Sequence, residues 1–401
     1  MVDKDNIVPA TELERRRTTF QAHLQELDLD GALIVQKTDL FYFAGTIQEA
    51  QLYIPCQGQP LLMAYKSLER AQAESALERI VRLSTPRNLP LLLTEHGYRQ
   101  PKRLGLELDV LPTQRYFQYQ QIFAGVELSD VSHHIRLTRT VKSAYELELM
   151  RIAAGLSDRL AASVPELLRQ GMTELELAGK VEGLARAWGH QGIVRMRLWG
   201  NELCYGHLMC GPDAAVPSYL ASPTGGSGPG AAIAQGAGMR LIEPNQPILL
   251  DYVFVHQGYI SDHTRIFSIG ELAPDLNRAH AAMLQIQDEI GPKAKPGVEA
   301  GEIYRLAVAM AEKAGYGDFF MGAAKPRIKF VGHGVGLELD EYPFLAKGQT
   351  MPLAEGMTIA LEPKLVFPNR GVVGIENTHV VTKEGLQRLG SFPDEICVVD
   401  V

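Results

Sequence analysis

Four carboxylic acids in this 401-residue chain lie where an ionised side chain is hardest to accommodate. Each interrupts, ends or closely follows an apolar run that predicts a buried β-strand. An ionised carboxylate in such a place is costly unless it pairs with a cation or binds a metal ion. A fold for this chain must therefore give these acids partners. The four acids are Asp251, Asp262, Glu362 and Glu376.

The first two acids are eleven residues apart. A hairpin that turns near Gly258 would place Asp262 beside Asp251. The alternative is that Asp251 forms an ordinary buried ion pair with Arg265, which needs no metal.

His333 adds a fifth donor. It lies in the glycine-rich run 332–336, where the backbone can approach closely and present one imidazole at a fixed point. A structural role is the alternative for a single histidine of this kind. Together with the four acids, however, His333 completes a set of metal ligands. A catalytic zinc uses about three protein ligands, so this larger set favours two ions roughly 3.5–4 Å apart. Its carboxylate-rich chemistry suits Mn²⁺, Co²⁺, Zn²⁺ or Fe²⁺, and such a pair would activate a water molecule for hydrolysis.

The length of the chain predicts two domains. Residues 11–131 alternate between helical stretches and short apolar runs, which indicates an α/β domain. We place the boundary in the polar stretch 137–143, interpreted as extended, which gives domains 1–140 and 141–401. In the second domain, strands are expected over about 192–270 and from 328 onward. Helices are expected at 144–168, 173–188, 276–291 and 300–314.

The first domain has its own predicted elements. Thr11 and Glu14 have the spacing of a capping box, so a helix is expected from Thr11 to Leu27. Arg15, Arg16 and Arg17 are interpreted as a solvated face of that helix. Strands are predicted at 32–35, 51–55, 61–65, 80–83 and 104–108.

Charge and composition exclude several classes of protein. The formal net charge of −8 argues against a nucleic-acid partner. No run approaches the roughly 20 apolar residues that span a bilayer. The polar residues 1–6 do not suit a secretory or transit signal, so a cytoplasmic location is expected. Four cysteines without CxxC spacing (Cys56, Cys204, Cys210 and Cys397) are consistent with reduced thiols.

The order of the five donors resembles that of the pita-bread metallopeptidases, which include prolidase, aminopeptidase P and methionine aminopeptidase, with creatinase as a relative. The matching features are Asp262 eleven residues after Asp251, His333 in Gly-His-Gly-x-Gly, Glu362 before proline, and Glu376. The segments 139–143 and 295–298 are also similar. The resemblance implies an α+β fold, with a pita-bread catalytic domain preceded by a creatinase-type N-terminal α/β domain.

The resemblance also implies roles for these residues. Asp251 would bind one metal ion bidentately, Asp262 and Glu376 would bridge both ions, and His333 and Glu362 would bind the other. Glu362 would also handle the proton of the attacking water, so Glu362 and His333 are the expected catalytic residues. The implied activity is that of an Xaa-Pro dipeptidase or aminopeptidase acting on short proline-containing peptides. The implied assembly is a homodimer.

The sequence departs from its relatives at three positions. Asp340 stands seven residues after His333, where peptidase members usually have a histidine. Neither the run 232–235 nor Ser218 supplies the other histidine that usually precedes the first metal ligand. Gly374 replaces a common arginine. We expect Asp340 and His263 to contact substrate, although Asp340 could instead cap the turn at 341–343. A structural role is the alternative for His263, as for His207 and His379.

Two other functions remain open. A creatinase-like hydrolase would cleave another C–N bond, as in a small amide, with the same scaffold. A non-catalytic binding module would have lost its ligands. The complete donor set and the acidic charge favour the enzyme.

Overall fold

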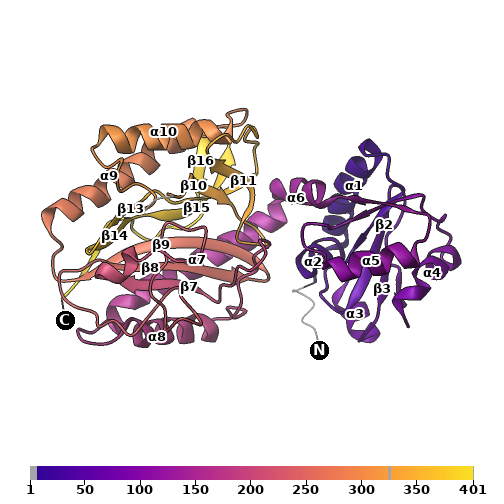
Figure 1. Ribbon diagram of the computed structural model, residues 1–401, viewed down its shortest axis with the longest axis horizontal. Coiled ribbons are helices and arrows are strands. Elements are labelled where there is room, and N and C mark those ends of the chain that lie inside the picture. Colours follow the sequence, from indigo (N-terminus) through magenta and orange to yellow (C-terminus); the bar gives the residue numbers. More distant parts are fainter. Residues whose placement is uncertain (1–6, 324–326, 401) are drawn as a thin grey trace. The chain divides into compact units, whose positions relative to one another are not determined.

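The computed structural model describes residues 7–323 and 327–400, and the chain divides into two compact units, Met1–Arg139 and Thr140–Val401. Figure 1 shows both units, each with its own sheet and helices. Residues 1–6, on which the expected location was based, lie outside the described part of the chain. No helix within the described residues is long and apolar enough to cross a membrane.

Unit 1 is a six-stranded mixed sheet with helices packed around it. The strand order is β4-β3-β2-β1-β5-β6, with β1 antiparallel to β2 and parallel to β5. The strands are β1 (Gly31–Ile34), β2 (Ala50–Pro55), β3 (Leu61–Ala64), β4 (Ile80–Arg82), β5 (Arg103–Leu106) and β6 (Glu127–Asp130). The helices are α1 (Ala10–Glu26), α2 (Lys37–Ala44), α3 (Leu68–Glu74), α4 (Leu89–Glu95), α5 (Thr113–Ile122) and α6 (Ser132–Thr140). Each predicted strand of this unit is present, with ends within two residues of those expected.

Two predictions for α1 are wrong. The helix begins at Ala10 after Pro9, without a side-chain cap, so Thr11 lies inside the first turn and does not form the expected capping box. Arg16 is fully buried and does not lie on a solvated face. Its guanidinium donates to Glu12 Oε1 and to the Tyr42 carbonyl, both at 2.8 Å, and lies over the Tyr42 ring.

The stretch 137–143 is not extended as predicted, because α6 continues to Thr140. Two buried ion pairs account for its polar character. Arg139 donates to Asp39 Oδ1 at 2.6 Å within unit 1. Lys142 donates to Glu341 Oε2 at 2.8 Å within unit 2. Ser143 then caps α7 through a capping box with Glu146.

Unit 2 is built on a nine-stranded sheet, whose main path has the order β11-β10-β12-β15-β9-β8-β7. The strands are β7 (Gly206–Cys210), β8 (Ile248–His256), β9 (Tyr259–Ile269), β10 (Phe330–Gly334), β11 (Glu341–Ala346), β12 (Thr358–Leu361), β15 (Glu376–Thr382), β16 (Gly385–Arg388) and β17 (Cys397–Val399), with a separate hairpin of β13 (Lys364–Phe367) and β14 (Gly371–Gly374). The helices are α7 (Ala144–Leu167), α8 (Glu174–Ala187), α9 (Pro274–Ile290) and α10 (Ala300–Lys313).

Unit 2 has two hydrophobic cores. One core joins α7 and α8 to β7, β8 and β9. The other joins α9 and α10 to β10, β12 and the β13–β14 hairpin, and it also includes Leu249 of β8 and Ile266 of β9. The two halves of unit 2 meet where β9 pairs with β15 in the middle of the sheet. Figure 1 shows α9 and α10 on the side of unit 2 opposite α8.

The glycine-rich part of unit 2 contains fewer strands than predicted. Residues 216–247 are mostly turns and loops, including the expected loop at 225–230. Buried Glu174 at the start of α8 anchors this region, because its carboxylate accepts hydrogen bonds from the backbone N–H groups of Cys210 and Gly238. The four cysteines, all within the described residues, are free thiols, as predicted.

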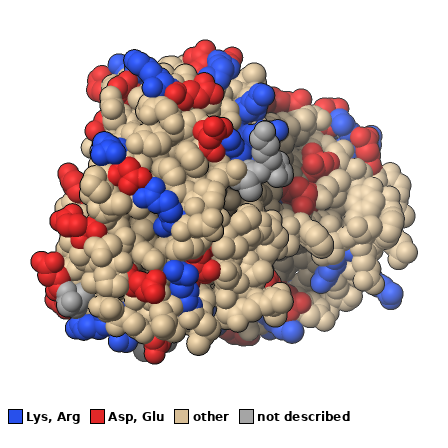
Figure 2. All heavy atoms as spheres, turned by 60° about the vertical axis from the view of Figure 1, so that its left-hand side comes forward, with Lys and Arg blue, Asp and Glu red and all other residues tan. Residues whose placement is uncertain are grey.

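Acidic and basic side chains are interspersed on the face of the molecule that Figure 2 shows. Such mixing differs from the clustered Lys and Arg residues of a nucleic-acid interface.

The buried environment of Arg16 leads to a first prediction. Arg16→Ala should lower the free energy of unfolding by about 3–5 kcal/mol, as for other buried ion pairs that lose one partner. The matched control is Arg15→Ala, since Arg15 pairs with the same carboxylate but is partly exposed, and should cost less than about 1 kcal/mol. Chemical denaturation monitored by circular dichroism measures both. Equal losses in the two variants would contradict the role assigned to burial.

Candidate metal centre

Three neighbouring strands place carboxylates on one face of the sheet. The β8–β9 hairpin turns at residues 257–258, as predicted, and its register sets Asp251 opposite Thr264. On the other side of β9, Glu376 is also opposite Thr264. Asp262, two residues before Thr264, points to the same face because side chains alternate along a strand. The strand register therefore brings Asp251, Asp262 and Glu376 to the same face of the sheet.

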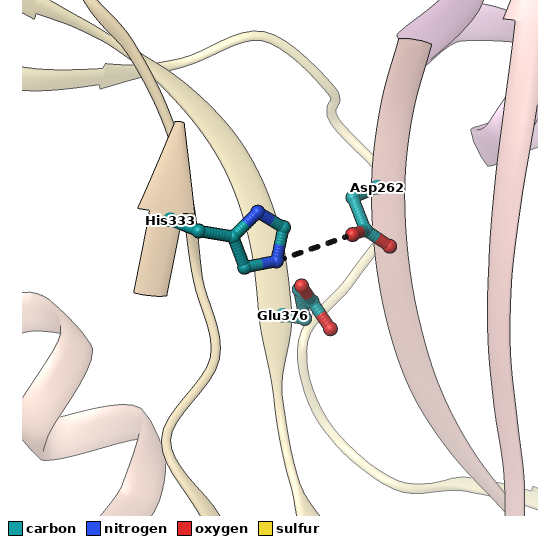
Figure 3. A group of neighbouring side chains, drawn as sticks. All are labelled: Asp262, His333 and Glu376. Carbon is teal, nitrogen blue, oxygen red and sulfur yellow. Dashed lines mark ion pairs between the residues drawn. The ribbon is translucent and has the colours of Figure 1, made fainter. Parts of the chain in front are cut away.

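The second half of the unit supplies the remaining donors. His333 on β10 and Glu362 just after β12 are held together because Gly332 pairs with Leu361. His333 Nε2 lies 3.7 Å from both Asp262 Oδ2 and Glu362 Oε1. Figure 3 shows the His333 ring directed at Asp262, with the Glu376 carboxylate beside them.

A buried carboxylate fixes the turn that follows His333. Glu341 Oε1 accepts hydrogen bonds from the backbone N–H groups of Leu337 and Glu338, at 2.9 and 3.2 Å. Its other oxygen pairs with Lys142. These bonds fix the backbone that follows His333, and the imidazole Nδ1 itself lies 3.2 Å from the Gly334 carbonyl oxygen.

The acids of this centre carry more negative charge than their surroundings can stabilise. Burial raises the pKa of Asp262 well above its usual range, and the nearby Glu376 and Asp251 carboxylates raise it further. Burial likewise raises the pKa of Glu362 to about 7, although Lys364 acts in the opposite direction. Such a cluster favours a bound cation.

The donor set fits a divalent ion. One ligand atom from each of Asp262, His333 and Glu376 lies within 4.8 Å of the others, and all three residues are buried. Oxygen and imidazole donors of this kind suit Mn²⁺, Fe²⁺, Co²⁺ or Zn²⁺. These residues, with the adjacent Glu362, would hold the ion, and a bound ion would supply an activated water and polarise a carbonyl.

One residue of the centre, Lys364, was not predicted from the sequence. Its buried ammonium lies 2.6 Å from Glu376 Oε2, 2.9 Å from Glu362 Oε2 and 3.1 Å from Asp251 Oδ2. Burial lowers the pKa of Lys364, but these three carboxylates outweigh burial and raise it well above its usual value. The signal was available, since Lys364 begins an otherwise apolar strand.

The predicted alternative partner for Asp251 is wrong. Arg265 points to the other face of the sheet, where it donates to Asp394 Oδ1 and Asn377 Oδ1. The cation beside Asp251 is Lys364. Thr224 Oγ1 also donates a hydrogen bond to the Asp251 carboxylate, at 3.3 Å.

The centre opens into a narrow cavity of about 80 Å³. Its walls combine the donors with apolar side chains and His207; the apolar ones include Leu220, Val253, Phe330 and Leu339. His207 on β7 pairs with Asp251 on β8. The His207 Nε2 atom lies 3.2 Å from Gln235 Oε1. A structural role was the alternative for His207, and the structure places this residue in the wall of the cavity.

His263, predicted to contact substrate, does not reach this cavity. Its side chain lies on the opposite face of the sheet, with Nε2 3.7 Å from Asp158 Oδ1 and the ring near Phe392. The alternation of side chains along β9 explains the difference, because His263 follows Asp262 directly. His379 and Ser218 are also not among the described residues that line the cavity.

Asp340 does line the cavity, as its predicted role requires. Its Oδ1 lies 3.9 Å from His333 Nδ1, on the side of the ring that faces away from Asp262. Burial lowers the pKa of His333, but the carboxylates of Asp340, Glu362 and Glu376 outweigh burial and raise it. The hydrogen-bond partner of His333 Nδ1 is the Gly334 carbonyl oxygen at 3.2 Å, a backbone contact that orients the ring of a metal-binding histidine, and Asp340 adds a nearby negative charge.

Comparison with known families agrees with this geometry. Residues 148–383 match the model of metallopeptidase family M24, and residues 16–141 match the creatinase/prolidase N-terminal domain. The chain therefore belongs to metallopeptidase family M24. The predicted α+β fold, with a pita-bread domain after a creatinase-type N-terminal domain, is confirmed.

The similar proteins include peptidases from bacteria and archaea. An Xaa-Pro dipeptidase of Pyrococcus furiosus is 27% identical over 388 residues, which cover 96% of this chain and 100% of that protein. The structure of an Xaa-Pro dipeptidase from Bacillus anthracis superimposes with a TM-score of 0.80 at 23% identity, covering 97% of this chain and 99% of that one. Dipeptidase PepE from Mycobacterium ulcerans gives a TM-score of 0.79 at 25% identity, with coverages of 98% and 100%.

The position of Asp340 leads to a second prediction. Asp340→Asn should weaken binding of Mn²⁺ or Co²⁺ by less than about 10-fold, the low end of the effect of changing the surroundings of a metal-binding histidine, because it removes a nearby charge and leaves the Gly334 contact in place. Titration calorimetry measures this affinity. Exposed Asp288 on α9 is the matched control, and Asp288→Asn should leave the affinity unchanged. A loss of stability without a loss of affinity would instead support the turn-capping alternative.

Proposed function

We propose that this protein is a metal-dependent Xaa-Pro peptidase that cleaves short proline-containing peptides, with Asp262, His333, Glu362 and Glu376 binding the catalytic ion. Membership of family M24 makes it a metallopeptidase-like hydrolase. The observation that carries the proposal is the convergence of these buried donors at one cavity wall, with more negative charge than the surrounding protein neutralises.

Glu362 is the residue we assign to proton transfer. It is buried, its Oε1 faces His333, and its pKa of about 7 suits a group that accepts a proton from water and later returns it. His333 would hold the ion, with Asp340 behind it. The apolar wall formed by Leu220, Val253 and Leu339 is suited to a proline ring.

A substrate panel with and without chelator tests the function. Xaa-Pro dipeptides, Xaa-Pro-Yaa tripeptides, proline-free dipeptides and small amides should be compared in Mn²⁺ and Co²⁺. We expect proline peptides to be hydrolysed, EDTA to abolish turnover, and added metal to restore it. Hydrolysis of amides alone would favour the creatinase-like alternative, and inactivity on every substrate would contradict the proposal.

Paired glutamate variants make this test specific. Glu376→Gln should reduce kcat/KM by more than about 100-fold, the upper end of what loss of a ligand's hydrogen-bond partner costs. The control is Glu384→Gln, since Glu384 is exposed beyond the end of the same strand.

We further propose that the chain is a homodimer, on the basis of its resemblance to prolidase-like proteins and its creatinase-type N-terminal unit. Light scattering at micromolar concentration should give twice the 44.1 kDa of one chain. A mass close to that of one chain would contradict this proposal.

A further inference from the structure

The Lys364 ammonium lies among three of the carboxylates that were expected to bind metal ions. It contacts one oxygen each from Asp251, Glu362 and Glu376, residues that come from three different strands or strand ends. An ammonium group has three N–H donors, so these three contacts use its full capacity. The carboxylates surround Nζ as they would surround a bound cation.

The backbone next to Lys364 leaves room for its side chain. Lys364 on β13 pairs directly with Gly374 on β14. A Cβ atom added to Gly374 would lie 2.7 Å from Lys364 Cα and 3.1 Å from its Cγ. Gly374 also has a φ of +149°, a conformation that side chains other than glycine rarely adopt. The bare glycine therefore leaves the space through which the lysine stem reaches the carboxylates.

The Lys364 side chain is 1% exposed where it lies. An ammonium displaced by an ion would give up three charged partners and could move only into the adjoining cavity. A second divalent ion would also stand within a few ångströms of that ammonium. The four carboxylates carry four negative charges, which Lys364 and one divalent ion already reduce to a single negative charge.

The oxygens that Lys364 leaves unused still define one metal site. Glu362 Oε1 and Asp262 Oδ2 both lie 3.7 Å from His333 Nε2, and neither oxygen is one that Lys364 contacts. The donor group of Asp262, His333 and Glu376 is therefore available to one ion.

We propose that the Lys364 ammonium permanently occupies one of the two cation positions expected for this centre, so that the chain binds a single divalent ion. The inference rests on the proposed metal-dependent function and revises the predicted number of ions. In this arrangement, Asp251 is a partner of Lys364 and not a metal ligand. Lys364 is a fixed positive charge that positions Glu362 and Glu376 for the ion.

Metal stoichiometry tests the proposal without reference to activity. The full-length protein is incubated with Mn²⁺, desalted, and analysed by native and elemental mass spectrometry. We expect one ion per chain, and an electron paramagnetic resonance spectrum of an isolated Mn²⁺ and not of an exchange-coupled pair. Two ions in the unmodified chain would overturn the proposal.

Four variants show whether Lys364 is the cause. Lys364→Met and Lys364→Gln remove the charge and should bind two ions, whereas Lys347→Met, at an exposed lysine, should still bind one. Asp251→Asn should keep one ion with nearly unchanged affinity. A single ion in folded Lys364 variants, or loss of the ion in Asp251→Asn, would overturn the assignment.

The two proposals fail in different ways. Two ions together with peptide hydrolysis would overturn the inference and leave the function intact. One ion without hydrolysis of any substrate would overturn the function and leave the cation assignment intact. A chain that binds no ion would overturn both.

Discussion

The catalytic unit depends on neutralising four carboxylates, three of them buried, that its own sheet brings together. The pairing of β9 with β15 joins the two halves and, in the same step, brings Asp262 and Glu376 into one buried cluster. Like charges at this distance destabilise the sheet unless a cation lies between them. The stability of the unit and its chemistry therefore have the same origin, and a bound ion should strengthen the fold through linkage.

Much of this arrangement could be predicted from the sequence, because a charged residue in an apolar strand is a strong signal. The same signal identified Asp251 and Glu362 but was not applied to Lys364, since only acids were considered as departures from the apolar pattern. His263 was predicted incorrectly for a different reason. Its neighbour Asp262 points to the centre, and alternation along β9 sends His263 to the opposite face.

Other errors came from long-range contacts that a local pattern does not contain. Arg16 belongs to a triplet of basic residues that was predicted to be exposed. Inside unit 1, however, its guanidinium donates hydrogen bonds to the Glu12 carboxylate and the Tyr42 carbonyl. Arg139 makes the linker look polar and extended, yet its partner Asp39 is 100 residues away. Glu12 is a local partner of Arg16, but the Tyr42 carbonyl and Asp39 are brought to these arginines only by the tertiary fold.

The direct pairing of Lys364 with Gly374 has a consequence for how such a centre can change during evolution. A larger residue at position 374 would collide with the backbone and side chain at position 364, and loss of Lys364 alone would leave three buried carboxylates short of a cation. The two positions are therefore epistatic. If the positive charge moved from position 364 on β13 to position 374 on β14 during evolution, one intermediate sequence would carry a charge at both positions or at neither.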